Sequence, residues 1–259
     1  DVYKRQTLAD AWAAPGAQGR PFILMQPADG KPVYLRFVEG DAVEGYGPMR
    51  THGWNAIELL VEDPDAVAEQ VAESPFKIIG PPKDLWPAPD APRAMQVLGP
   101  GNEVVYLTRN NDFVTDLPID RVFIMVLGGP SMSDLQRFYT DALGAVAGEA
   151  TPFQISVISN ALELPAETTY PLAIATVSPE YLIELDEYPD AAIPRPVADG
   201  ELPPGIAITT FTTDSLDAID VEWRATPRVI DAMPYDGRRT AVTVGPAGEW
   251  IEIIETPAD

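Results

Sequence analysis

Apolar residues alternate at strand spacing and then recur at helical spacing, in the same order, several times along the chain. Residues 54–61 form a β-rich apolar run. Asp63 is suited to cap a helix that begins at Pro64, and apolar residues then recur at helical spacing. Further extended runs follow at 76–80, 93–98 and 103–107, the last two joined by a Gly-Asn turn. The pattern predicts one strand, one helix and three strands.

The same order recurs in the second half of the chain. A strand at 119–126 precedes a helix at 131–143, and Gly144 suits the end of that helix. We expect further strands at 152–164, 170–177 and 181–187. In a last copy we expect a strand at 205–211, a helix from Asp214 or Ser215 to 223, and strands at 240–244 and 250–255. The pattern over residues 21–38 predicts only a hairpin, which corresponds to the last part of a first copy.

The copies align on one position in their last strands. These positions are Tyr34, Val105, Glu184 and Glu252, which lie 71, 79 and 68 residues apart. A pitch near 70 residues indicates internal duplication. The first copy lacks an opening strand, and the first six residues resemble a translated adapter of the kind found at the ends of metagenomic reads. We therefore expect an N-terminally truncated chain whose own sequence starts near Thr7.

Two short phrases add to the repeat. Phe138-Tyr139-x-x-x-Leu143-Gly144 follows a strand, and Gly245-Pro246-Ala247-Gly248-x-x-Ile251-Glu252 leads into the last strand. Together with the repeat, the chain resembles the vicinal oxygen chelate superfamily of glyoxalases, bleomycin-resistance proteins, fosfomycin-resistance enzymes and extradiol dioxygenases. The resemblance implies an α+β fold of four βαβββ modules, the first incomplete, which pair into two glyoxalase-like domains. We expect these domains at 7–110 and 117–259, each with a cup inside its sheet.

The resemblance also implies where a metal would bind. Members hold it with a His near the start of the first strand and a Glu in the last strand. The first-strand positions of the last three copies carry Ala56, Arg121 and Ala207, so no His is present there. Only the second domain keeps carboxylates at the last-strand position, Glu184 and Glu252. We expect no cofactor, and a divalent metal (Mg, Mn or Fe) held by these two carboxylates is the alternative.

Strand parity predicts that Arg121, Glu184 and Glu252 point into one cup of the second domain. They are the candidate catalytic residues. Three interpretations stay open: a buried salt bridge, metal binding by the carboxylates, and contact of Arg121 with an anionic ligand.

Other residues are weaker candidates. The cup-facing set that we expect to contact a ligand consists of Arg121, Phe123, Met125, Phe211 and Trp54. Tyr106 and Trp250 alternate with cup positions, so we expect them to pack under the helices. Glu58 is a weak acid/base candidate, and His52 is expected at a cup rim.

The amino-acid composition excludes some classes of binding partner. The chain has 259 residues, a formal charge of −23, one His and no Cys. Its acidity argues against binding nucleic acid or anionic lipid, since both are polyanions. No run of about 18 apolar residues occurs, so no membrane-spanning helix is predicted. We take a cytoplasmic location as the default, and a possible homodimer through the unpaired edge of the first domain.

Three functions remain at this stage. The preferred one is a small-molecule-binding protein that holds an organic ligand, with an anion as one candidate, in the cup of the second domain without a His-liganded metal. The alternative is a metal-dependent lyase, isomerase or ring-cleavage dioxygenase-like enzyme that uses Glu184 and Glu252. A third is a structural protein whose cups are filled by side chains. A fold of this kind hosts many chemistries, so the resemblance does not fix a reaction.

Overall fold

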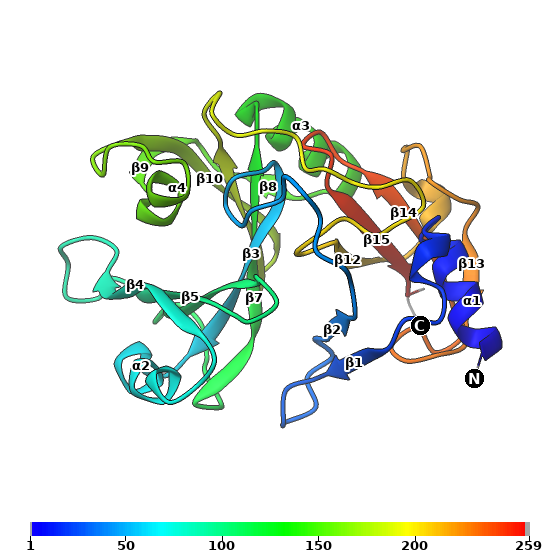
Figure 1. The fold of residues 1–259 in the computed structure, drawn as a ribbon, viewed down its shortest axis with the longest axis horizontal. Coiled ribbons are helices and arrows are strands. Elements are labelled where there is room, and N and C mark those ends of the chain that lie inside the picture. The colour runs from blue at the N-terminus through cyan, green and yellow to red at the C-terminus, as the bar shows by residue number, and fades with distance from the viewer. Residues whose placement is uncertain (1, 257–259) are drawn as a thin grey trace.

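Two sheets, one of nine strands and one of four, lie on either side of a shared core (Figure 1). The computed structural model describes residues 2–256 and the side chains from residue 7 onward. The nine-stranded sheet contains β3 (Gly53–Val61), β4 (Lys77–Asp84), β5 (Arg93–Leu98), β6 (Val104–Arg109), β7 (Ile119–Gly129), β8 (Val146–Ala147), β9 (Thr151–Gln154), β10 (Thr169–Ser178) and β11 (Tyr181–Glu187).

The remaining elements are fewer. The four-stranded sheet contains β12 (Ile208–Thr213), β13 (Arg228–Ile230), β14 (Arg238–Val244) and β15 (Trp250–Glu255), and a separate hairpin contains β1 (Phe22–Met25) and β2 (Leu35–Val38). The helices are α1 (Val2–Ala11), α2 (Pro64–Ala72), α3 (Met132–Leu143) and α4 (Ser156–Ala161), with 3₁₀ turns η1 (Pro15–Ala17) and η2 (Leu216–Ala218). No helix in residues 2–256 combines the length and apolarity needed to span a bilayer.

Local capping confirms two predicted helices. The Asp63 side chain accepts a hydrogen bond from the backbone N–H of Asp65 at the start of α2. At the start of α3, Ser131 accepts one from the N–H of Asp134. Gly144 ends α3 with a φ of +66°, a left-handed conformation that favours glycine. These residues fix both helices from short-range interactions alone.

The same strand order occurs in three units, residues 53–109, 119–187 and 208–255. In each unit the first strand lies parallel to the last, as β3 does to β6, β7 to β11 and β12 to β15. The last strand then pairs antiparallel with the one before it. This shared topology supports the internal repeat in those three stretches. Residues 22–38 contribute the β1–β2 hairpin only, so the described residues do not show four complete modules.

The units pair differently from our expectation. Strands β3 and β7 are antiparallel neighbours, with Ile57 opposite Met125, so the nine-stranded sheet continues across residues 110–118. A division into 7–110 and 117–259 would cut this sheet. Residues 110–118 are polar and rich in turns, as a linker would be, but here they connect adjacent strands. The unit at 53–109 therefore pairs with the unit at 119–187, whereas we expected the stretch before residue 110 and the stretch after residue 117 to pair each within itself.

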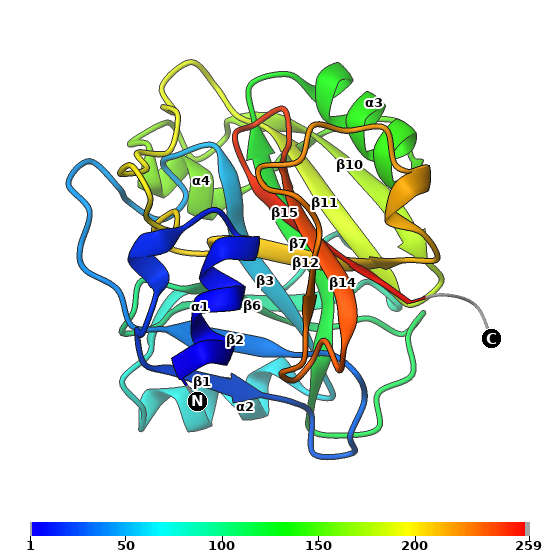
Figure 2. The same cartoon turned by 90° about the vertical axis from the view of Figure 1, so that its right-hand side faces the viewer.

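The largest core cluster lies between the two sheets. Helix α3 contributes Leu135 and Tyr139, β11 contributes Ile183, and β15 contributes Ile253. All four side chains are fully buried. We call this cluster the central core. On the other side of the four-stranded sheet, α1 packs beside the β1–β2 hairpin (Figure 2).

Two predicted elements differ from the structure. The predicted strand 152–164 is the short strand β9 followed by α4, whose neighbouring Val157 and Ile158 are both buried, a pattern that fits a helix on a sheet better than a strand. The predicted helix from 214 or 215 to 223 is reduced to the single turn η2. Only Leu216 of that turn is buried, so little packing is available to stabilise a longer helix.

Candidate functional site

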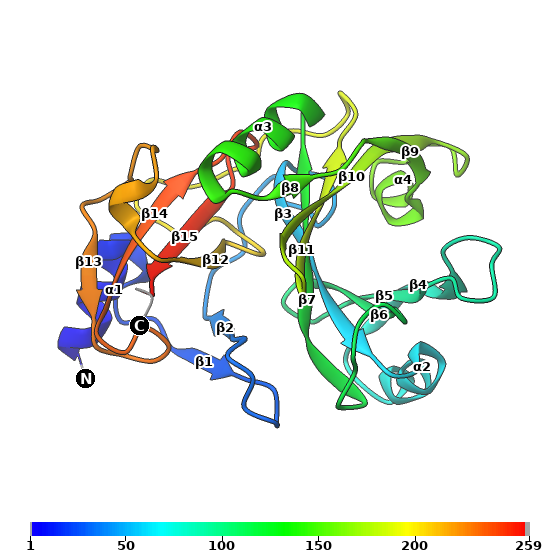
Figure 3. The same cartoon turned by 180° about the vertical axis from the view of Figure 1, so that it is seen from behind.

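The nine-stranded sheet folds around a concave face. Its two arms, β4–β5–β6 and β9–β10–β11, extend to the same side of β3 and β7, and α4 lies between them (Figures 1 and 3). Helices α2 and α3 cover the outer faces of the arms. The concave face is thus built by the units at 53–109 and 119–187 together.

Strand register places several polar side chains on this concave face. Tyr106 on β6 lies opposite Glu58 on β3, and Gln96 on β5 lies opposite Tyr106. Directly paired residues share a face, so these three side chains form one row. On β11, Glu184 lies opposite Val126 of β7.

Two further pairs identify the face that these residues share. Asp186 lies two residues beyond Glu184 and opposite Leu172 of β10. Leu172, Tyr106 and Val126 pack in one apolar cluster that also contains residues of α4. Glu184 and Asp186 are therefore on the α4 side of the sheet. We call Glu58, Glu184 and Asp186 the acidic cluster.

Glu58 and Asp186 are buried, Glu184 is partly buried, and the three carboxyls influence one another. Burial raises the pKa of Glu58 to about 7. Burial also raises the pKa of Glu184 well above its ordinary value, with further increases from the charges of Asp186 and Glu58. The pKa of Asp186 rises for the same reasons, burial first and then Glu58. At neutral pH these carboxyls therefore hold protons that exposed carboxyls would have lost.

Several polar atoms beside the acidic cluster have no hydrogen-bond partner in the part of the chain that the structure describes. They are both carboxyl oxygens of Asp186, the hydroxyl of Tyr106 and Oε1 of Gln96. Asp186 is 0% exposed and Tyr106 is 6% exposed, so bulk water does not replace the missing partners. An unmet buried polar group costs about 1–3 kcal/mol. These buried atoms without hydrogen bonds are therefore unfavourable for stability.

The pKa of the Tyr106 hydroxyl responds to the charges of the acidic cluster. After burial, the charges of Glu184 and Asp186 are the largest causes that raise the pKa of Tyr106, and Tyr188 and Glu58 contribute as well. Tyr188 follows β11 and its pKa is also raised, by burial and then by Asp186. The carboxyls of the acidic cluster therefore raise the pKa values of two phenols on this face.

Apolar side chains surround this polar centre. In α4, Ser159 shares a 2.9 Å hydrogen bond with the hydroxyl of Tyr170, which fixes the helix to β10. Leu98, Leu172 and Phe153 pack in the same cluster and are only partly buried. The concave face therefore combines buried polar groups with accessible apolar walls, which is typical of small-molecule sites.

Glu252, a predicted catalytic residue and metal ligand, lies on β15, away from the concave face, and both of its carboxylate oxygens already accept hydrogen bonds. It accepts hydrogen bonds from the indole N–H of Trp12 (2.9 Å), the hydroxyl of Tyr235 (3.0 Å) and the hydroxyl of Thr210 (2.8 Å). These donors come from the segment after α1, from the loop before β14 and from β12. Glu252 therefore ties the four-stranded sheet to the N-terminal segment.

Glu184 and Glu252 do not meet. Glu184 alternates along β11 with Ile183, and Glu252 alternates along β15 with Ile253. Both isoleucines point into the central core. The two carboxyls therefore lie on opposite sides of that core and cannot bind one ion, which corrects the expected ligand pair.

Arg121 does not face the acidic cluster either. It is 2% exposed, donates to the carbonyl oxygen of Val114 at 3.3 Å and pairs with Asp120 and Glu180. Its guanidinium lies over the ring of Tyr181. Arg121 is near the start of β7, whereas Glu184 lies opposite Val126, five residues further along that strand. Of the three interpretations, the salt bridge describes Arg121, with Asp120 and Glu180 as partners.

The apolar residues predicted to line a ligand site are core residues. Trp54 and Phe211 pack together in the central core, their ring centroids 6.3 Å apart. Met125 packs against the same core. Phe123 makes an edge contact with Phe113 on another part of the sheet. The prediction for Trp54, Phe123, Met125 and Phe211 as one ligand wall is therefore wrong, because the cup was placed between the wrong pair of units.

Sequence reasoning missed Tyr106, Asp186 and Tyr188. The alignment chose Val105 as the cup-facing position, but Val105 packs under α2 and Tyr106 faces inward. A slip of one residue moves a whole strand to the other face. Asp186 shares the parity of Glu184 on one strand, and this signal was present in the sequence. Glu58, a weak candidate, is at the centre of the site.

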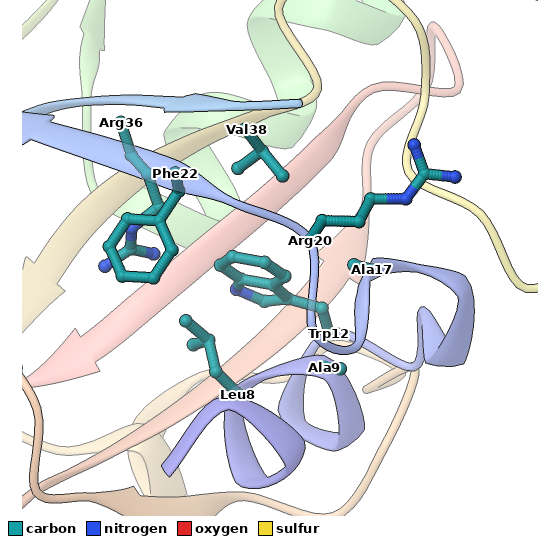
Figure 4. Close-up of a pocket in the computed structure, with 8 residues that line it drawn as sticks. All are labelled: Leu8, Ala9, Trp12, Ala17, Arg20, Phe22, Arg36 and Val38. Carbon is teal, nitrogen blue, oxygen red and sulfur yellow. The ribbon is translucent and has the colours of Figure 1, made fainter. Parts of the chain in front are cut away.

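A small pocket occurs near the other sheet (Figure 4). It has a volume of about 20 Å³, room for about one water, between α1, η1 and the β1–β2 hairpin. Arg36 lies beside the rings of Trp12, Phe22 and Tyr235 there and donates a 3.0 Å hydrogen bond to the hydroxyl of Tyr235. Arg36 therefore helps to hold Trp12 and Tyr235 in place, the two residues that donate hydrogen bonds to Glu252.

The described residues do not fit the metal site of the resembled superfamily. No group of three or more His, Cys, Asp or Glu side chains within them is placed to hold a metal ion. His52 lies at the start of β3, and its pKa is lowered by burial and by Arg195. The carboxyls of the acidic cluster have raised rather than lowered pKa values. We therefore derive no step through a metal.

Comparisons with known proteins agree with the topology. No family model and no curated protein matches the sequence. A glyoxalase I mutant from Zea mays has a similar structure, with a TM-score of 0.60, 14% identity, and coverage of 91% of this chain and 79% of that chain. A putative dioxygenase from Bacillus subtilis has a TM-score of 0.56, 10% identity, and coverage of 93% and 74%. At these identities the likeness establishes the fold alone, and the chain therefore has the fold of glyoxalase I over most of its length.

Proposed function

We propose that this protein binds a small organic molecule on the concave face between β3, β7 and α4, without a His-liganded metal. The observation that carries the proposal is Asp186, whose two carboxyl oxygens are buried and unpartnered at the centre of that face. A buried polar group with no structural use is retained at a cost, and a ligand that supplies its missing hydrogen bonds explains the retention.

Two further observations support this function. Leu98 and Leu172 are partly buried apolar side chains on this face, and a small organic ligand would pack against them. The solved structures with this fold include proteins named as a glyoxalase and a putative dioxygenase, both names of enzymes. The metal-dependent alternative that relies on Glu184 and Glu252 gains no support, because the central core separates the two residues.

A ligand screen with a blocking variant tests the function. Leu172→Trp adds a large side chain to the concave face, and Val229→Trp adds the same side chain at an exposed position of β13. Compounds from a library of small organic molecules that raise the melting temperature of the wild type should act on Val229→Trp and lose their effect on Leu172→Trp. Circular dichroism establishes that both variants fold.

Two results would contradict the proposal. One is a screen without hits, confirmed by mass spectrometry that finds no small molecule in extracts of the purified protein. The other is a set of hits that stabilise Leu172→Trp and the wild type equally. Ile174→Trp, on the strand position opposite Glu184, provides a second blocking variant if Leu172→Trp fails to fold.

A further inference from the structure

The unmet polar atoms of the concave face are mainly hydrogen-bond acceptors. A carboxylate and an amide oxygen accept only, and a phenol hydroxyl both donates and accepts. Asp186 supplies two such oxygens, Gln96 one and Tyr106 one. A molecule that satisfies them must therefore be rich in N–H or O–H donors.

The acidic cluster also lacks a counter-charge among the described residues. The salt bridges that those residues form do not include Glu58, Glu184 or Asp186. Arg195 is a cation whose charge reaches Tyr188, and it lowers the pKa of that phenol. Its own N–H groups are engaged by Thr51 and by backbone oxygens, including that of Trp54. The acidic cluster therefore has no salt-bridge partner among the described residues, and protons take the place of a counter-charge in the free protein.

We infer that the ligand of the concave face is an organic cation, an ammonium group carried on an apolar chain. This inference rests on the proposed function and specifies its ligand class. It also replaces the expectation of an anionic ligand, which depended on Arg121 facing the site.

An ammonium group matches the site in three respects. It carries three donors and no acceptor, which suits the two unmet oxygens of Asp186 when this carboxyl is ionised. Its charge is complementary to Glu58 and Glu184, and charge-assisted hydrogen bonds are about twice as strong as neutral ones. The apolar chain would lie along the partly buried Leu172. An anion would meet three carboxyls and no described cation in contact with them.

Binding of a cation must also move protons. The groups that face the acidic cluster are Tyr106 and Gln96 from the β5–β6 arm, Tyr170 from β10, and Tyr188 after β11, with Arg195 beyond Tyr188. Three of these groups are phenols and one is an amide, so none of them supplies a positive charge to the acidic cluster near neutral pH. Carboxyls that are protonated in the free protein should therefore ionise when the ammonium arrives, and binding should release protons.

Three six-carbon probes test the inference: hexylamine, hexanol and hexanoate. Isothermal titration at pH 6.5 in two buffers of different ionisation enthalpy gives both the affinity and the protons released. We expect hexylamine to bind at least about tenfold more tightly than either analogue and to release protons. Asp186→Asn and Glu58→Gln should each weaken hexylamine about tenfold or more and leave hexanol within about twofold, because they remove charge and keep shape. Asp190→Asn, at an exposed position, is the matched control.

Each result has a separate meaning. Equal or tighter binding of hexanol or hexanoate on the concave face would overturn the cation inference and leave the proposed function standing. Hexylamine binding that is unchanged in Asp186→Asn and Glu58→Gln would also overturn it. If none of the three probes binds, the cation inference fails, and the library screen with Leu172→Trp decides the proposed function on its own.

Discussion

Tyr106 on β6 and Glu58 on β3 are direct register partners on parallel strands, and the hydroxyl of Tyr106 has no hydrogen-bond partner in the described part of the chain. We predict that Tyr106→Phe leaves the free energy of unfolding unchanged or raises it by up to about 1 kcal/mol, because the substitution removes an unmet buried polar group and keeps the ring. Urea denaturation measures this change. A loss of more than 1 kcal/mol would show that the hydroxyl has a partner.

Tyr139 provides the opposite case. It is as buried as Tyr106, but its hydroxyl donates a 2.8 Å hydrogen bond to Glu249, which also accepts from the backbone N–H of Ala247. Tyr139→Phe should lower the free energy of unfolding by about 1–3 kcal/mol, because it leaves a buried carboxyl short of a donor. The same urea experiment measures both variants. Equal effects of Tyr106→Phe and Tyr139→Phe would contradict the assignment of partnered and unpartnered hydroxyls.

The acidic cluster predicts a pH dependence of stability. The folded-state pKa of Glu58 is raised from 4.5 to about 7, so the folded state holds more protons than the unfolded state between these values. The contribution of Glu58 to the free energy of unfolding is fully present below pH 4.5. It is lost as the pH rises through 7, and the loss is at most about 3 kcal/mol. Glu58→Gln should remove this part of the slope, whereas Glu69→Gln, at an exposed position of α2, should retain it. A wild-type slope in Glu58→Gln would refute the assignment.

Glu252 has a structural role in this account. Tyr235→Phe should cost about 1–3 kcal/mol of unfolding free energy, since it removes a buried donor to this carboxylate. Glu252→Gln should destabilise the protein and leave the affinity of concave-face ligands within about twofold, because the central core separates the two places. Denaturation and titration of the two variants check both statements. A tenfold loss of ligand affinity in Glu252→Gln would place Glu252 in the site after all.

The periodic elements were predictable because local interactions determine them. Asp63, Ser131 and Gly144 mark helix ends through their own side chain or backbone, and these signals are visible in the sequence. The repeat was visible for the same reason, since each unit repeats one order of short-range patterns. The likeness to glyoxalase I confirms the fold that the repeat suggested.

The site was not predictable to the same degree, because it depends on which strands become neighbours. The pairing of β3 with β7 is a long-range choice, and the polar segment between them resembles a domain linker. The choice of Val105 instead of Tyr106 then exchanged the two faces of β6. Glu184 was expected on a concave face from strand parity within its own unit, and the structure places it on one, but Arg121 and Glu252 were grouped with it through the wrong pairing.

A crystal structure of the complex with hexylamine tests the central claim most directly. We predict the amine nitrogen within hydrogen-bond distance of Asp186 and of at least one of Glu58 and Glu184, with the alkyl chain along Leu172. An amine bound outside the concave face, or a concave face in which protein groups alone satisfy both oxygens of Asp186, would contradict the account.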